Sequence, residues 1–144
     1  MTPARTIDSI NSNAIRGFIV FDGSTGAVLK NRNLTLVKTA TGSYNITCDE
    51  SIRTGSANWG VVITNIDDGI LSQTPSGINA STISNFQNDW WNAFVATRTT
   101  TGFTVRAKRT YSQYFTFLVG NDNAGGNAFG IEAVDPSYIA LIVF

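Results

Sequence analysis

Apolar and polar residues alternate with a period of two along most of the chain. In "TGSYNITCDE", Tyr44, Ile46 and Cys48 fall on one face of an extended segment, and the residues between them are polar. This period indicates a strand with one buried face. A matching run begins at Leu34, and Gly42, between the two runs, readily adopts the positive φ of a tight turn. The pattern predicts a β-hairpin.

Similar patterns recur on both sides of this hairpin. "AIRGFIVFDGSTGAVL" predicts two strands joined by a Gly-rich turn at Asp22–Gly26, and residues 93–109 predict a second hairpin. "WGVVITNI" and the C-terminal "YIALIVF" are apolar on both faces, as is typical of central strands. In the C-terminal strand, Leu141 and Val143 face one way and the residues between them face the other. "YFTFLVG" predicts a further strand.

Three segments are polar and lack a clear period. We expect residues 67–91 to form a surface loop with a short helix or turn near "ISNFQND", and "NDNAGGNAFG" to form a Gly/Asn loop. Residues 1–13 predict a polar N-terminal arm, followed by one domain over residues 14–144. No helix longer than two turns is predicted. The strands indicate an all-β fold, an antiparallel β-sandwich.

The composition narrows the class of protein. Charged residues make up 14% of the chain, against about 25% in ordinary soluble domains. A surface poor in charge suits a chain that hides area in an assembly. The formal net charge is zero, which argues against nucleic-acid binding, because phosphate contacts need a basic excess. No signal peptide or spanning segment is visible, so we expect a soluble chain made in the cytoplasm.

Little in the sequence suggests catalysis. The chain has no histidine and one cysteine, which excludes Ser-His-Asp and Cys-His sites, His-ligated zinc and an internal disulfide. We interpret Cys48 as a small buried hydrophobe. Asp67-Asp68 and Asp49-Glu50 are candidate carboxylate pairs for glycoside hydrolysis. Neighbours on a strand point to opposite faces, so solvated turn residues are the favoured interpretation, and we expect neither enzymatic activity nor a cofactor.

A calcium loop is a further possibility. Asn121, Asn123, Gly126 and Glu132 fall at positions 1, 3, 6 and 12 of the calcium-loop template. Position 1 should be Asp, position 5 is Gly125, and no helices flank the segment. A Gly-rich surface loop without a metal is therefore the favoured prediction.

A basic cluster and a pair of tryptophans are the candidate binding groups. Arg98, Arg106, Lys108 and Arg109 lie close together on the second predicted hairpin. A solvated face is the favoured interpretation, and a contact with an anionic glycan or a partner is the alternative.

Trp90 and Trp91 are adjacent, and two neighbours on a strand cannot face the same core. Either the segment is buried on both sides, or one of the two side chains is offered to a subunit or a ligand. Tryptophan is common at interface hot spots and at sugar-stacking surfaces. The sequence leaves these alternatives open.

The order of the segments resembles the C-terminal domain of bacteriophage tail fibres. The resemblance rests on "AIRGFIVFDGSTGAVL", "TGSYNITCDESI", "NWGVVIT", "TTTGFTVRAK" and "DPSYIALIVF". It spans residues 14–144, although residues 67–92 are not distinctive. The resemblance implies a jelly-roll-like β-sandwich knob that assembles as a homotrimer, faces outward from the virion tail and attaches to the host cell surface. Tail fibres usually carry a long N-terminal shaft, whereas residues 1–13 alone precede this domain. This difference leaves three alternatives: a fragment of a longer fibre, a small stand-alone fibre, or a capsid decoration protein of the same fold.

Under this interpretation the partners are other copies of the chain, other tail or capsid proteins, and a host glycan or protein. We expect recognition to sit on exposed loops, residues 67–88 and 121–130, because loops on a rigid scaffold carry binding. The candidate residues for receptor or partner contact are Trp90, Trp91, Arg106, Lys108, Asn121, Asp122 and Asn123. The doubly apolar final strand is expected at the trimer interface, through Tyr138, Leu141 and Val143.

Overall fold

The chain folds into antiparallel β-sheets. A computed structural model describes residues 14–65, 83–119 and 122–144, and for residues 65, 83–90, 111–119 and 122–129 it describes the backbone. The elements, in order, are β1 Gly17–Phe21, β2 Val28–Arg32, β3 Leu34–Ala40, β4 Ser43–Cys48, the short 3-10 helix η1 Glu50–Ile52, β5 Val61–Asn65, β6 Ile83–Thr99, β7 Gly102–Val119, β8 Asp122–Ala133 and β9 Ile139–Val143. No helix in these ranges is long and apolar enough to cross a membrane.

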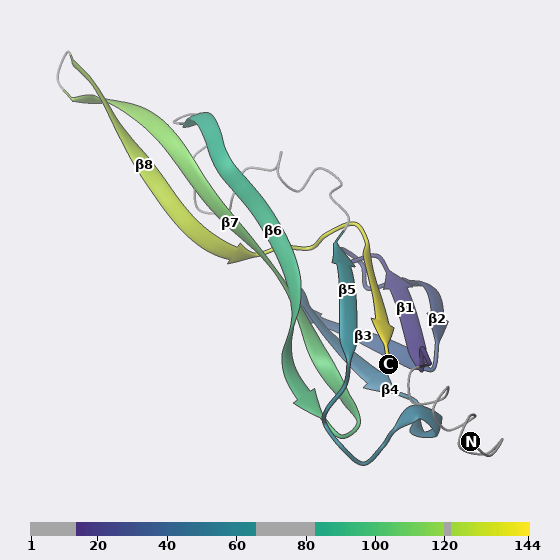
Figure 1. The fold of residues 1–144 in the computed structure, drawn as a ribbon. Coiled ribbons are helices and arrows are strands. Elements are labelled where there is room, and N and C mark those ends of the chain that lie inside the picture. Colours follow the sequence, from purple (N-terminus) through teal and green to yellow (C-terminus); the bar gives the residue numbers. More distant parts are fainter. Residues whose placement is uncertain (1–13, 66–82, 120–121) are drawn as a thin grey trace.

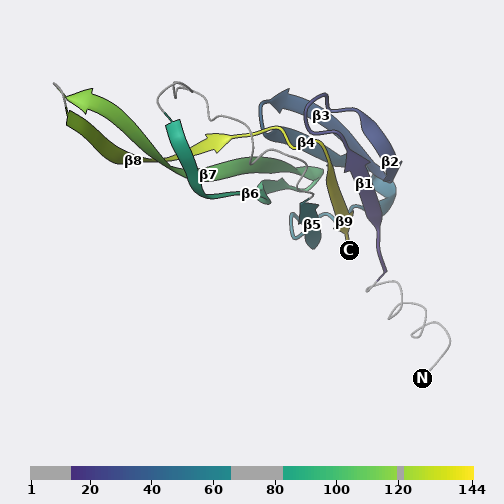
Figure 2. The same ribbon diagram turned by 90° about the horizontal axis from the view of Figure 1, so that it is seen from above.

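Two sheets share one core. Strands β2-β1-β9-β5 form sheet A, and β3-β4-β7-β6 form sheet B, with β8 also paired to β7. Figures 1 and 2 show the two layers, with β1, β9 and β5 in one and β3, β4 and β7 in the other. Alternate residues of β1, β4, β7 and β9 point into the core. The rings of Phe21 and Tyr44 meet across it, with their centroids 4.9 Å apart. The predicted all-β class and antiparallel pairing are confirmed.

Sheets A and B are joined by a sharp corner at Asn33. β2 ends at Arg32 and β3 begins at Leu34, so one extended run changes sheet within a single residue. Asn33 has φ 60°, a conformation that asparagine tolerates better than most residues. Its side-chain amide donates to the Arg16 carbonyl at 2.9 Å, which fixes the corner against the start of β1.

Both early hairpins agree with the sequence, whereas the position of β5 does not. β3 pairs with β4 and β1 pairs with β2. Gly42 has positive φ as predicted, and Gly26, in the predicted Gly-rich turn, has positive φ as well. β5, however, is an edge strand of sheet A, and β1 and β9 occupy the centre. An outward valine of β5, Val62, is 49% exposed. The doubly apolar pattern of β5 therefore reflects a surface-facing apolar position rather than burial on both sides.

A three-stranded arm extends beyond the two-sheet body. β4 pairs with the first residues of β7, and β8 then takes its place along the same edge of β7 from Lys108 to Val119. β6 follows the other edge from Ile83 to Thr99. Figure 1 shows β6, β7 and β8 running away from the body together. The second hairpin is confirmed and is longer than residues 93–109.

Three local predictions in the arm are wrong. "ISNFQND" belongs to strand β6 rather than to a helix or turn, and residues 122–130 of "NDNAGGNAFG" belong to β8 rather than to a loop. Residues 114–119 of "YFTFLVG" are the end of β7 and not a separate strand. Each residue of β8 has a partner on β7, and this pairing outweighs the weak strand propensity of Gly and Asn. Residues 67–82 of the predicted long loop lie outside the described residues.

Asp135 anchors the connection from β8 to β9. Its carboxylate accepts hydrogen bonds from the Gly42 amide at 2.7 Å and from Lys38 Nζ at 2.7 Å, and it lies 3.0 Å from the Tyr44 hydroxyl. The same hydroxyl lies 2.9 Å from the Gly23 carbonyl. Burial, and next the negative charge of Asp135, raise the pKa of Tyr44 well above its ordinary value, so the phenol stays protonated. This cluster ties three turns of the fold together.

Gly42 is the residue at which the turn of the first hairpin meets the arm. Its φ is +61°, and a Cβ built there would collide with the carbonyls of Ala107 and Val134. We expect Gly42→Ala to lower the free energy of unfolding by more than the about 1–2 kcal/mol that a positive φ alone costs. Gly55→Ala is the control, because Gly55 also has positive φ, +76°, but open space around it. Equal losses in urea unfolding of the two variants would show that the close approach at Gly42 is unimportant.

Candidate recognition site

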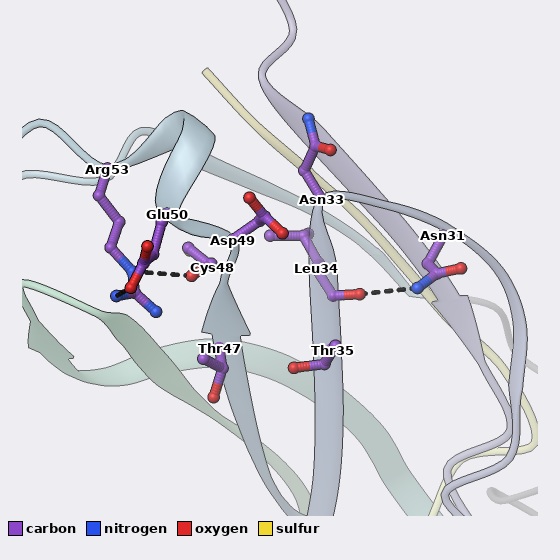
Figure 3. Close-up of a pocket in the computed structure, with 9 residues that line it drawn as sticks. All are labelled: Asn31, Asn33, Leu34, Thr35, Thr47, Cys48, Asp49, Glu50 and Arg53. Atoms are coloured by element: carbon purple, nitrogen blue, oxygen red, sulfur yellow. Dashed lines mark hydrogen bonds and ion pairs between the residues drawn. The ribbon is translucent and has the colours of Figure 1, made fainter.

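A polar hollow lies beside the Asn33 corner. It has a volume of about 390 Å³, within the roughly 300–1,000 Å³ of small-ligand sites. Figure 3 shows the residues that line it, which come from the end of β2, the start of β3, the end of β4 and the turn that follows. We call this hollow the corner pocket; it is lined by Asn31, Asn33, Leu34, Thr35, Thr47, Cys48, Asp49, Glu50 and Arg53.

The strand alternation explains the polar lining. Thr35 and Thr47 are opposite each other in the β3–β4 register, and both are exposed. Figure 3 shows them side by side on the two strands. Asn31 donates from its side chain to the Leu34 carbonyl at 2.8 Å, which holds the amide at the rim. The change of sheet at Asn33 therefore brings the amides of Asn31 and Asn33 close to the hydroxyls of Thr35 and Thr47.

Charged groups close one side of the corner pocket. The Asp49 carboxylate accepts a hydrogen bond from the Ser51 amide at 2.9 Å. Hydrogen bonds from the backbone and then the side chain of Ser51 hold the pKa of Asp49 below its usual range. Arg53 donates from Nε to the Cys48 carbonyl at 2.9 Å, and its Nη1 lies 3.8 Å from Glu50 Oε1. The Asp49-Glu50 pair lies where β4 meets a turn, as predicted.

Cys48 belongs to the wall of the corner pocket but is itself buried. Desolvation raises the pKa of its thiol from 9.0 to about 11, and the nearby Arg53 opposes this only in part. The prediction that Cys48 is a buried hydrophobe is confirmed.

The burial of Cys48 makes its reactivity a measure of folding. Because the thiolate is the reactive form, we expect Ellman's reagent at pH 8 to label Cys48 at least about a hundredfold more slowly in the native chain than in urea. The pKa shift alone supplies about that factor, and burial of the sulfur adds to it. Equal rates in the two states would show that the thiol is accessible. A Cys48→Ser variant provides the reagent blank.

The predicted basic cluster is divided between two faces of β7. Arg106 and Lys108 are exposed and lie beside a second hollow of about 250 Å³, at the point where β8 replaces β4 along β7. Arg98 is also exposed. Arg109, in contrast, faces inward and is 1% exposed, with Nη1 4.0 Å from Glu132 Oε1. The cluster therefore has three exposed members rather than four, because residue 109 falls on the core side of the strand alternation.

The structure describes the side chain of Trp91 but not that of Trp90. Trp91 is buried and belongs to the core, on the same face as Ala93. Its backbone pairs with Arg109 of β7. The side chain of Trp90 lies outside the described residues, so the alternatives of interface and ligand platform stay open for that residue alone.

Two of the candidate polar contact residues lie at the end of the arm. Asp122 begins β8 and pairs with Val119, and Asn123 follows it. Asn121 lies outside the described residues, as do the side chains of the other two. Figure 1 places this end of the β7–β8 hairpin farthest from the body. Glu132, the last position of the calcium-loop template, lies at the opposite end of β8, beside Arg109. The described template residues, Asn123, Gly126 and Glu132, therefore lie along a strand instead of around a loop.

The residues expected at the trimer interface are also split. Tyr138 is partly exposed, but Leu141 and Val143 are buried in the core. The predicted alternation of β9 is confirmed, and it directs these two side chains toward sheet B rather than outward. The outward positions of β9 are Ala140 and Ile142. An interface through this strand would therefore use that second set.

Sequence reasoning missed the corner pocket and the Asp135 cluster. The alternation of apolar and polar residues singles out neither Asn33 nor Asp135. The available signal was the "NRN" run between two apolar-alternating segments, which marks a possible positive φ within an extended run. Comparison of the chain with protein-family models, curated proteins and solved structures finds no match.

Proposed function

We propose that this chain is a bacteriophage virion structural protein, a homotrimeric knob of the tail-fibre type that attaches to the host cell surface. The observation that carries the proposal is the outer face of sheet A, which is largely apolar although nothing in the described chain covers it. The order of the sequence segments resembles that of tail-fibre C-terminal domains, and this resemblance supports the role in host attachment. The two-sheet body is the rigid scaffold that such a binding knob requires.

The outer face of sheet A forms a largely apolar surface. Val62, Ile142 and Phe18 lie in one row across β5, β9 and β1, and Thr64, Ala140 and Val20 lie in the next. Val62 and Thr64 are exposed, and the other four are half-buried in the isolated chain. Contiguous apolar surface of this kind is typical of protein–protein contacts. Copies of the chain are the proposed occupant, because a homo-oligomer covers the same face on every protomer.

Basic groups border this face along β2. Arg32 lies opposite Phe18, with its guanidinium carbon 5.8 Å from the ring centroid, and Lys30 lies opposite Val20. Arginine beside an aromatic ring is common at the rims of interfaces. The apolar centre and charged border together support burial of this face in an assembly. The arm would then project from the trimer and carry Asp122 and Asn123 at its far end.

Val62→Asp tests this assembly. A carboxylate in a desolvated apolar interface is strongly unfavourable, so the variant should be a monomer where the natural chain is a trimer. Because Val62 is 49% exposed in the single chain, the monomer should still fold. Val37→Asp is the matched control, since Val37 is 63% exposed on the other sheet; it should stay trimeric. Sedimentation velocity at micromolar concentration decides it. A monomeric natural chain, or equal behaviour of the two variants, would contradict the proposal.

Attachment is tested by competition. Purified chain, incubated with host cells before the phage is added, should lower the rate of phage adsorption, because it occupies the same surface receptors. Replacing the arm end, residues 119–123, with Gly and Ser should leave the trimer intact and weaken this competition. An excess of trimeric protein that leaves adsorption unchanged would count against a role in attachment.

A further inference from the structure

We infer that the corner pocket is a binding site for a neutral saccharide. The inference deepens the proposed function, on which it rests for its biological context, by naming a ligand class and a place in the fold. It uses only the groups that line the corner pocket.

The corner pocket contains side-chain hydrogen-bonding groups that have no partner within the described part of the chain. The side-chain amides of Asn31 and Asn33 each donate one hydrogen bond to a backbone carbonyl. Among the hydrogen bonds of the described residues, none uses their side-chain oxygens or the hydroxyls of Thr35 and Thr47. The corner pocket therefore offers acceptors from the two amides and groups that both donate and accept from the two threonines.

A second feature is the charge of the corner pocket. Arg53 and Glu50 lie close enough to neutralise one another in part, with 3.8 Å between Nη1 and Oε1. Asp49 adds a second carboxylate, and Arg53 is the single cation of the lining, so the corner pocket carries a net negative charge. A phosphate or a carboxylated sugar would meet this net negative charge at close range, which disfavours binding. An uncharged ligand meets no such penalty, and its hydroxyls can donate to a carboxylate.

A third feature is its shape. The corner pocket is open, and its exposed lining is about as apolar as it is polar, so it suits a ligand that stays partly in water. Its wall includes the buried Leu34 and Cys48, which contribute apolar area for C–H groups. A ring that carries hydroxyls at its edge and C–H groups on its face combines both properties. A neutral pyranose fits this set of groups.

The test is a titration followed by ¹⁵N–¹H NMR on the whole chain. The neutral probes are the methyl glycosides of glucose, galactose, mannose and N-acetylglucosamine, and the charged probes are N-acetylneuraminic acid, glucosamine and inorganic phosphate. At least one neutral probe should give saturable shifts at residues 31–35 and 47–53. Absence of saturable shifts with all four neutral probes, or stronger binding of a charged probe, would overturn the inference.

Isosteric variants locate the ligand. Thr35→Val and Thr47→Val each remove one hydroxyl and keep the shape and strand propensity of the side chain, so each should weaken the best neutral probe by about two- to tenfold. Thr39→Val, an exposed threonine at the far end of β3 from the corner pocket, is the control and should bind as the natural chain does. Unchanged affinity in the Thr35→Val, Thr47→Val double variant would place the ligand elsewhere. Protein that still blocks phage adsorption but binds no neutral glycoside here would overturn this inference alone.

Discussion

A chain that ends before Tyr138 should not fold. β9 pairs with β1 on one side and β5 on the other, so its removal leaves both neighbours without their central partner. Ile139, Leu141 and Val143 are buried in the core, and each large side chain removed from a core costs about 2–5 kcal/mol. The total stability of a domain is about 5–15 kcal/mol. The truncated chain should lack a cooperative thermal transition in circular dichroism.

Deletion of Phe144 alone is the control for this truncation. The residue follows β9, and its side chain is half exposed, although its ring contacts Gly60. This shorter deletion should keep a cooperative transition at a modestly lower temperature. A truncation before Tyr138 that melts like the natural chain would show that β9 is peripheral to the fold.

Asp135→Ala should lower the free energy of unfolding by about 2–4 kcal/mol. The change leaves the Gly42 amide and the Lys38 ammonium without their carboxylate partner. Gly42 is buried, and the Lys38 side chain is only partly exposed. Removal of one member of a partly buried, charge-assisted cluster lowers the free energy of unfolding more than loss of a neutral hydrogen bond does. The reason is that the remaining polar groups stay shielded from water but no longer have a hydrogen-bond partner. Equilibrium unfolding in urea measures the loss.

Two further variants test whether the negative charge of Asp135 and its place in the cluster account for the loss of stability. Asp135→Asn keeps the shape and one acceptor, so it should retain part of the lost stability. Glu50→Gln removes a carboxylate that is almost fully exposed, and it should leave the unfolding midpoint unchanged, as most exposed ion pairs do. If Asp135→Ala behaves like Glu50→Gln, the three turns are held together by packing and not by this carboxylate.

The sequence predicts the body of the fold better than the arm. Alternation predicts the buried face of β4, and the run of apolar residues in β9 predicts a central strand, which the sheet order confirms. Alternation failed at β8, whose Gly and Asn residues have weak strand propensity and extend only because β7 offers a continuous edge for pairing. It also failed to place β5, because an apolar side chain on an outward face looks the same in a sequence as one in a core.

The candidate sites were less predictable still, for a geometric reason. The corner pocket brings Asn31, Asn33, Thr35, Thr47 and Asp49 together only because the chain changes sheet at one residue with positive φ. Arg109 was grouped with exposed basic residues because spacing along the chain does not say which face of a strand is outward until the pairing is known. Sites that depend on long-range register are not visible in local patterns.

The proposed role as an outward-facing knob on a phage tail is tested most directly by the location of the protein on the virion. Antibodies against the purified chain, coupled to gold and viewed on intact virions by electron microscopy, should label the tail tip. Gold spread over the capsid would contradict the tail assignment and favour the decoration protein of the same fold. Intact virions that bind no gold, with denatured virions reacting on a blot as control, would contradict an exposed location altogether.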